Sequence, residues 1–188
     1  MIKPLTGMKI AVLMANGFDE KSFLRAQKEI LEMGATMRIV STNQGLVNGW
    51  EGSAWGHNYA VDVALNTALG VDYDAMILVG GQRSLDKLKL TAHTRRFIGS
   101  FMAAHKPVMV MDDAIQLMGM CDQIKDIKVT GPESSREESE NAGAEWMGSN
   151  LEMADNMLSG MTDADNADQY FSTMGEMLMQ CEPMDQAA

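Results

Sequence analysis

Two adjacent aspartates, Asp112 and Asp113, are the residues of this sequence whose type and position best suit acid–base chemistry. They stand between the apolar run "KPVMVM" and the stretch "AIQLMGMCDQI" (114–124), which is typical of a helix. Two carboxyl groups in one cleft push one pKa upward, so one could serve as an acid while the other stays ionised. A structural interpretation is also open, because aspartate tolerates a left-handed backbone and can accept hydrogen bonds from the free N–H groups of a following helix.

The aspartate pair admits two other chemical roles. Asp112 could be a nucleophile, since carboxylates form covalent intermediates, although hydrolysis of such an intermediate normally needs a base. With Asp19 as a third carboxylate, the pair could also hold a hard cation such as Mg²⁺. We favour the structural interpretation over both. We expect no metal site and no cofactor, since the sequence holds no CxxC motif or cysteine–histidine cluster.

The cysteines and histidines offer no nucleophile–base pair beside the aspartates. Cys121 comes roughly two and a half helical turns after the pair, so it is predicted to be a buried apolar residue. Cys181, near the C-terminus, is interpreted as an incidental thiol. His57, in a glycine-rich loop, is the histidine that could approach the aspartates, whereas His93 and His105 are typical of exposed helix positions.

The elements that must position these residues alternate between strand and helix. Apolar runs predict strands, and runs of 3.6-residue periodicity predict helices. The strands are expected at 8–15, 36–42, 74–81, 107–112 and 156–161, and the helices at 19–34, 91–106, 114–124 and 163–181. Shorter expected features are a hairpin within 43–62, a short helix at 65–70, a short strand from 128 and a polar helical stretch around 134–142. This alternation predicts an α/β fold with a mainly parallel sheet covered on both faces.

Parallel sheets place ligands beyond the carboxyl ends of their strands. Three segments end strands at that edge: "NGFDEKS", "GGQRS" and "MDDA". The candidate site residues that they carry are Asp19, Ser22, Gly80, Gly81, Asp112 and Asp113. The glycine pair has a structural explanation of its own, a tight turn into which no larger residue fits.

Composition and charge exclude several classes of function. The net charge of −11 repels phosphate backbones, which disfavours nucleic-acid binding. No apolar run approaches the roughly 20 residues that span a bilayer, and the N-terminus is interpreted as a first strand rather than a signal peptide. We therefore expect one cytoplasmic domain over residues 1–188, with frayed ends at 1–7 and 182–188.

The candidate segments, in this order, resemble the DJ-1/PfpI superfamily, also called the class I glutamine-amidotransferase-like fold. "KIAVLMANGFDEKSF" resembles the family's first strand and turn, "YDAMILVGGQRSLDKLKL" its strand ending in Gly-Gly, and "KPVMVMDDAIQLM" its nucleophile elbow. "NAGAEW" (141–146) is similar to a segment of the PfpI-type intracellular protease branch. The resemblance implies a flavodoxin-like three-layer α/β sandwich, a homodimer or larger homo-oligomer, and activities that span peptidase-like, amidase, glyoxalase and chaperone roles, several of them in stress.

The sequence departs from the family at the residues that carry chemistry. Asp112 stands where the resemblance places the nucleophilic cysteine, and Asp113 where it places the following histidine. Ser22 replaces the supporting glutamate, whereas Asp19 keeps an acidic position. The pair Gly80-Gly81 is retained, and in the family a backbone N–H there helps to form the oxyanion hole.

The resemblance and its departures lead to a principal hypothesis and two alternatives. The principal one is a non-proteolytic homologue without the catalytic cysteine and histidine, acting through binding in a stress-related or chaperone-like role. The first alternative is a hydrolase or lyase that uses Asp112 and Asp113 at the elbow, and the second is a ligand-binding sensor. Two aspartates in the pocket favour a cationic or neutral ligand over an anion.

Overall fold

The protein is built around a seven-stranded sheet. The computed structural model describes residues 3–181, and the strand order in the sheet is β11-β12-β8-β7-β1-β3-β6. All neighbouring strands are parallel except the edge pair of β11 and β12. The strands are β1 (Lys9–Leu13), β3 (Thr36–Ser41), β6 (Val63–Ala64), β7 (Ala75–Leu78), β8 (Val108–Met111), β11 (Leu151–Ala154) and β12 (Met157–Gly160). The predicted α/β fold with a mainly parallel sheet is confirmed.

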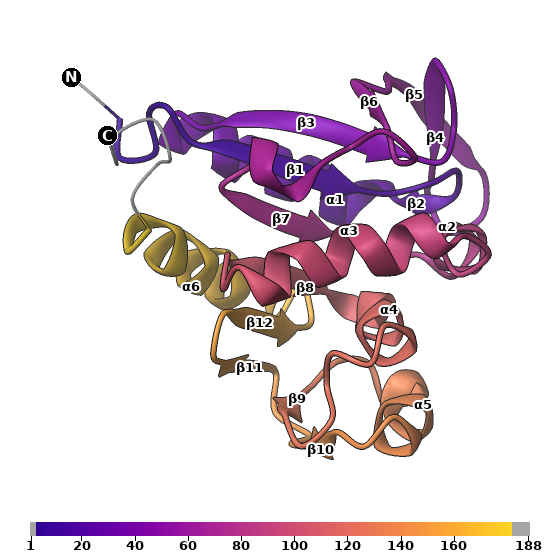
Figure 1. Ribbon diagram of the computed structural model, residues 1–188, viewed down its shortest axis with the longest axis vertical. Helices are drawn as coiled ribbons and strands as arrows, with labels where there is room; N and C mark the ends of the chain where they lie inside the picture. Colours follow the sequence, from indigo (N-terminus) through magenta and orange to yellow (C-terminus); the bar gives the residue numbers. More distant parts are fainter. Residues whose placement is uncertain (1–2, 182–188) are drawn as a thin grey trace.

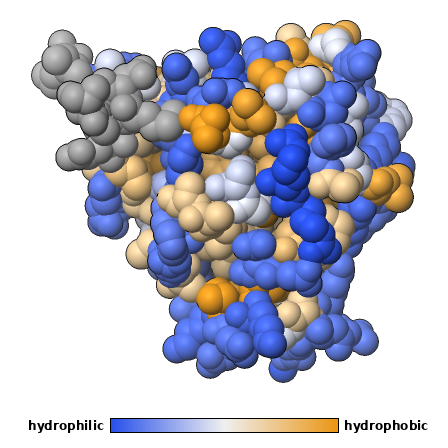
Figure 2. Space-filling model, viewed as in Figure 1, coloured by the Kyte–Doolittle hydropathy of each residue, from blue (hydrophilic) through white to orange (hydrophobic). Residues whose placement is uncertain are grey.

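Helices cover both faces of this sheet, which gives three layers (Figure 1). One face packs against α1 (Glu20–Met33) and α6 (Ala167–Met179), and the other against α2 (Gln82–Leu88), α3 (Ala92–Ala103) and α4 (Ile115–Met120). Because β1, β7 and β8 are buried on both faces, their residues are continuously apolar rather than alternating. On the side drawn in Figure 2, hydrophilic residues predominate and strongly hydrophobic ones form small separate groups. None of the described helices is long and apolar enough to cross a membrane.

Smaller sheets lie beside the carboxyl edge. The predicted hairpin is confirmed as β4 (Leu46–Trp50) and β5 (Trp55–Ala60), which form a sheet with the short β2 (Phe18–Asp19). The predicted short strand is β9 (Lys128–Val129), which pairs with β10 (Glu145–Trp146), and the polar stretch forms η3 (Glu133–Ser135) and α5 (Arg136–Asn141).

Two predicted features differ from the structure, and one helix was not predicted. The expected short helix at 65–70 is wrong: the chain turns there and forms the 3-10 helix η1 (Gly70–Asp72), because the Arg96 guanidinium takes the carbonyls of Leu65 and Ala68. Helix α2 was not expected, since its seven residues carry little apolar periodicity. The last helix begins at Ala167, four residues later than predicted.

The N-terminal segment also departs from the expected frayed end. Within 3–7, Leu5 is buried and its N–H donates to the carbonyl of Met33 at 2.9 Å. Residues 1–2 and 182–188 lie outside the described residues. The segment around Leu5 is therefore packed against the end of α1.

Candidate functional site

The turn after β8 has the geometry of an elbow. Asp112 opens the short 3-10 helix η2 (Asp112–Ala114), which leads into α4, and its φ is 52°. A positive φ is costly for any residue with a Cβ, although aspartate is among those that tolerate it best. The sharp turn directs the Asp112 side chain away from the helix that follows.

Both carboxylate oxygens of Asp112 accept hydrogen bonds. Oδ1 accepts the backbone N–H of Thr162 at 2.7 Å. Oδ2 accepts the hydroxyl of Ser22 at 3.3 Å and also contacts the hydroxyl of Thr162. The two hydroxyl oxygens lie 2.8 Å apart, so Asp112, Ser22 and Thr162 form one connected group.

Asp113 points to the glycine turn. Its Oδ1 accepts the backbone N–H of Gly81 at 2.8 Å, and a Cβ on Gly80 would lie 2.5 Å from the same oxygen. Asp19, from the segment after β1, also contacts this turn, because its backbone N–H donates to the carbonyl of Gly80 at 2.8 Å. The structure therefore brings together all six residues that the sequence placed at this edge.

The expectation that Asp112 or Asp113 caps the following helix is wrong. The first residues of η2 and α4 receive no side-chain cap, since both carboxylates are directed to other segments. Asp19 does act as a cap, because its Oδ1 accepts the N–H of Ser22 at 2.8 Å at the start of α1.

The electrostatic environment favours the neutral forms of both elbow aspartates. Burial raises the pKa of Asp112 above its ordinary value; hydrogen bonds from Thr162 oppose this, and the charges of Asp19 and Asp113 add to it. Burial likewise raises the pKa of Asp113. The hydrogen bond from the Gly81 N–H lowers it, but by less. Each carboxyl therefore holds its proton to a higher pH than an exposed aspartate would.

A hollow of about 260 Å³ opens over Asp112. Its lining consists of Asp19, Lys21, Ser22, Asp112, Thr162, Asp163 and Ala164. Asp113 is absent from this lining, so one of the two elbow aspartates faces the hollow and the other is directed to the glycine turn. The lining carries three carboxyl groups and one ammonium group, which suits a neutral or cationic ligand.

Thr162 is a site residue that the sequence analysis missed. It is buried and lies just after β12, whose carboxyl end is at the same edge as those of β8 and β1. Its position just after the predicted strand 156–161 could have indicated it, since ligands bind beyond the carboxyl end of every parallel strand in such a sheet.

The thiols lie apart from this site. Cys121 is 1% exposed, and burial raises its pKa to about 11, so it is a buried thiol as predicted. Cys181 is half-buried at the end of α6 and contacts the carbonyl of Met177.

His57 contacts the carboxylate of Glu20 rather than that of Asp112 or Asp113. The sequence analysis did not single out Glu20. Its Nδ1 lies 2.7 Å from Oε1 of Glu20, and the hydroxyl of Tyr59 lies 2.5 Å from the same oxygen. Burial raises the pKa of Glu20, but the bonds from Tyr59 and His57 together outweigh it, and the resulting pKa is lowered. A lone glutamate in a first helical turn resembles an ordinary partner of the helix dipole, so no sequence signal set it apart.

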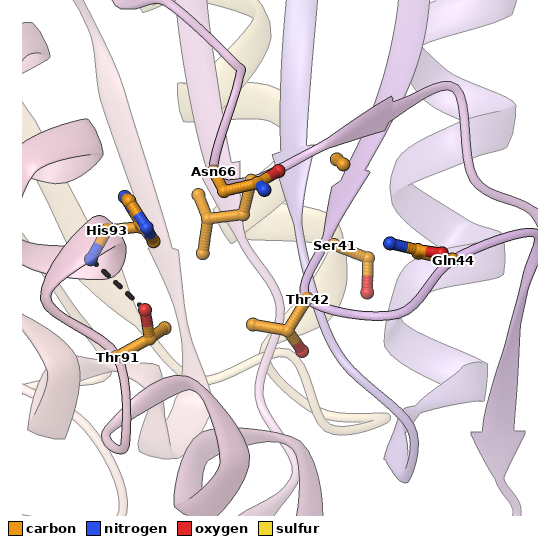
Figure 3. A pocket seen from close by; sticks show the side chains of 8 residues that line it. Ser41, Thr42, Gln44, Asn66, Thr91 and His93 are labelled. Carbon is orange, nitrogen blue, oxygen red and sulfur yellow. Dashed lines mark hydrogen bonds between the residues drawn. The ribbon is translucent and has the colours of Figure 1, made fainter.

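A second hollow, of about 300 Å³, lies at the carboxyl ends of β3 and β6 (Figure 3). The labelled polar side chains around it are Ser41, Thr42, Gln44, Asn66, Thr91 and His93. His93 is an exposed residue of α3, as predicted, and it also lines this hollow. Its lining includes no carboxylate and none of the six predicted site residues, so it is separate from the elbow.

Comparisons with known proteins agree with the fold. The model of the DJ-1/PfpI family matches residues 8–174. General stress protein 18 of Bacillus subtilis is 30% identical over 140 residues, which cover 74% of this chain and 79% of that protein. Deglycase PfpI of Pyrococcus furiosus is 25% identical over 158 residues, covering 84% and 92%. A solved ThiJ/PfpI domain protein from Brachyspira murdochii has a TM-score of 0.78 at 18% identity, covers 91% of this chain and 98% of that one, and shows the fold alone.

Proposed function

We propose that this chain, which belongs to the DJ-1/PfpI family, acts by binding a small neutral or cationic ligand at the elbow, without covalent catalysis. The observation that carries the proposal is the hydrogen bond from the Gly81 N–H to Asp113. A donor that already serves a carboxylate within the protein is not free to stabilise a developing oxyanion.

The state of Asp112 supports the same proposal. Its two oxygens accept hydrogen bonds from Thr162 and Ser22, and such bonds make a carboxylate a weaker nucleophile. Burial and two neighbouring carboxylates raise its pKa, which reduces the ionised fraction further. The hollow above it is lined mainly by polar and charged side chains, which supports the binding of a polar ligand.

The biological setting of this proposal is a stress response. Its support is the similarity to General stress protein 18 of Bacillus subtilis. We place the protein in the cytoplasm as a homodimer or larger homo-oligomer, a setting for which the family resemblance is the support.

An alternative function is favoured by one specific observation. A buried carboxyl with a raised pKa, open to a hollow, is also the arrangement of a general acid, and Asp112 has both properties. In that case the protein would be a hydrolase or lyase in which Asp112 supplies the proton, and the relatives named as deglycases make this chemistry relevant.

An activity screen separates the two functions. Purified chain is assayed for amidase, peptidase, glyoxalase and deglycase turnover beside Asp112→Asn and the matched control Cys121→Ser. We expect no turnover above the heat-inactivated sample in any of the three proteins, because no cysteine lines the hollow and the carboxyl group of Asp112 is hydrogen-bonded to Ser22 and Thr162. Turnover that Asp112→Asn abolishes and Cys121→Ser retains would establish a catalytic role for Asp112 and contradict the binding function.

A further inference from the structure

A second cluster of ligating side chains lies outside the elbow. Glu20, Glu51 and His57 each offer one ligand atom, and these atoms all lie within 4.8 Å of one another. Glu20 is the first residue of α1, Glu51 follows β4, and His57 belongs to β5. Three residues from the helix and the hairpin therefore converge on one point.

The carboxylate of Glu20 is held in a fixed position at this point. Its residue is 1% exposed, and it accepts bonds from the Tyr59 hydroxyl, the His57 ring and the His57 backbone N–H, the last at 3.1 Å. A Cβ on Gly56 would collide with Oε2, and one on Gly49 would lie 2.7 Å from it, so the backbone of both hairpin strands closes around the carboxylate. Hydrogen bonds that fix the position of a ligand atom in this way favour the binding of a metal ion.

The other two groups are exposed and able to adjust. The side chain of His57 is 77% exposed, and Glu51 is exposed at the end of β4. One imidazole with two carboxylates is a mixed nitrogen and oxygen set, which suits a borderline divalent ion such as Zn²⁺ better than Mg²⁺ or Ca²⁺. Two carboxylate charges also balance the charge of the ion.

We propose that Glu20, Glu51 and His57 form a binding site for a divalent transition-metal ion, with Zn²⁺ the best match. The protein supplies three ligands and solvent completes the tetrahedron. The bound ion joins the start of α1 to the β4–β5 hairpin and so adds stability to that contact.

The site lies beside the elbow without overlapping it. A hollow of about 420 Å³ is lined by Glu20, Glu51 and Trp50, and it shares Asp19 and Lys21 with the hollow over Asp112. The inference does not depend on the proposed binding function, since none of the three ligands belongs to the Asp112 group.

Zinc titration of the full chain, prepared without a histidine tag and followed by calorimetry, tests the proposal. We expect one Zn²⁺ per chain and a higher melting temperature in its presence. His57→Gln and Glu51→Gln each lower the affinity about tenfold or more. Both side chains are exposed, so these variants are expected to fold.

His105 provides the matched control, because its ring contacts a carboxylate, that of Asp155, at 3.1 Å on the surface. His105→Gln and Cys181→Ser leave zinc binding unchanged if the site is the one proposed. The proposal is overturned by wild-type protein that binds no Zn²⁺, by binding that His57→Gln does not weaken, or by an equal loss in His105→Gln.

Discussion

At the scale of the residue, Asp112 combines a strained backbone with a side chain whose two oxygens both accept hydrogen bonds. A left-handed backbone costs a non-glycine residue about 1–2 kcal/mol. The hydrogen bonds that its carboxyl accepts from Thr162 and Ser22 offset this cost, since a hydrogen bond within the protein contributes about 0.5–1.5 kcal/mol net. The elbow conformation therefore persists in this chain with a side chain that is anchored to neighbouring segments.

The raised pKa of Asp113 leads to a prediction about pH and stability. A carboxyl whose pKa is higher in the folded than in the unfolded protein destabilises the fold once it ionises. The penalty is absent below the ordinary pKa of 3.8 and complete above the raised value. The amide in Asp113→Asn keeps an oxygen for the Gly81 N–H and carries no charge, so this variant should gain stability over wild type as pH rises.

Urea unfolding of both proteins from about pH 4 to about pH 8 measures this difference. The free energy of unfolding of Asp113→Asn minus that of wild type should increase across the range. Asp165→Asn, at an exposed position, is the control and should show no such increase. A difference for Asp113→Asn that falls with pH contradicts the raised pKa.

At the scale of the element, the β4–β5 hairpin is attached to α1 through one carboxylate. Glu20 lies between the two strands because Gly49 and Gly56 leave the space that its oxygens occupy. The aromatic rings of Phe18, Phe23 and Tyr59 pack edge to face beside it, with centroids 5.0–5.6 Å apart. The hairpin thus depends on a polar contact and an aromatic contact at the same place.

Two glycine-to-alanine changes test this attachment. Gly56→Ala puts a Cβ into the carboxylate of Glu20, so we expect it to lower the free energy of unfolding by about 2 kcal/mol or more. Gly99 lies within α3 with nothing within 4 Å of an added Cβ, so Gly99→Ala should stabilise the protein by about 1 kcal/mol. Denaturant unfolding measures both, and equal effects of the two changes contradict the assigned role of Gly56.

At the scale of the whole molecule, the parallel sheet concentrates polar groups at its carboxyl edge. The hollow over Asp112, the hollow beside Glu20 and Glu51, and the hollow of Figure 3 all lie beside strand ends of the sheet or of its neighbouring hairpin. Buried methionines such as Met76, Met109 and Met111 fill the layers beneath, which is where unbranched side chains adapt best to irregular gaps.

The oligomeric state is a prediction at this scale. We expect sedimentation at micromolar concentration to give at least twice the mass of one chain, since the family resemblance implies a dimer or larger assembly. The measurement should be repeated at higher salt, because the net charge of −11 opposes association at low ionic strength. A stable monomer under both conditions contradicts the prediction.

The sequence by itself determined the alternation of strands and helices, and with it the edge at which Asp19, Ser22, the glycine pair and the two aspartates meet. Those features follow from local periodicity and from the geometry of parallel strands. The tertiary structure alone decided that Asp113 bonds to Gly81 rather than to its own helix, that Thr162 bonds to Asp112, and that Glu20 contacts His57. These contacts join residues 32 to 50 positions apart, and they depend on side-chain directions that only the packed molecule sets.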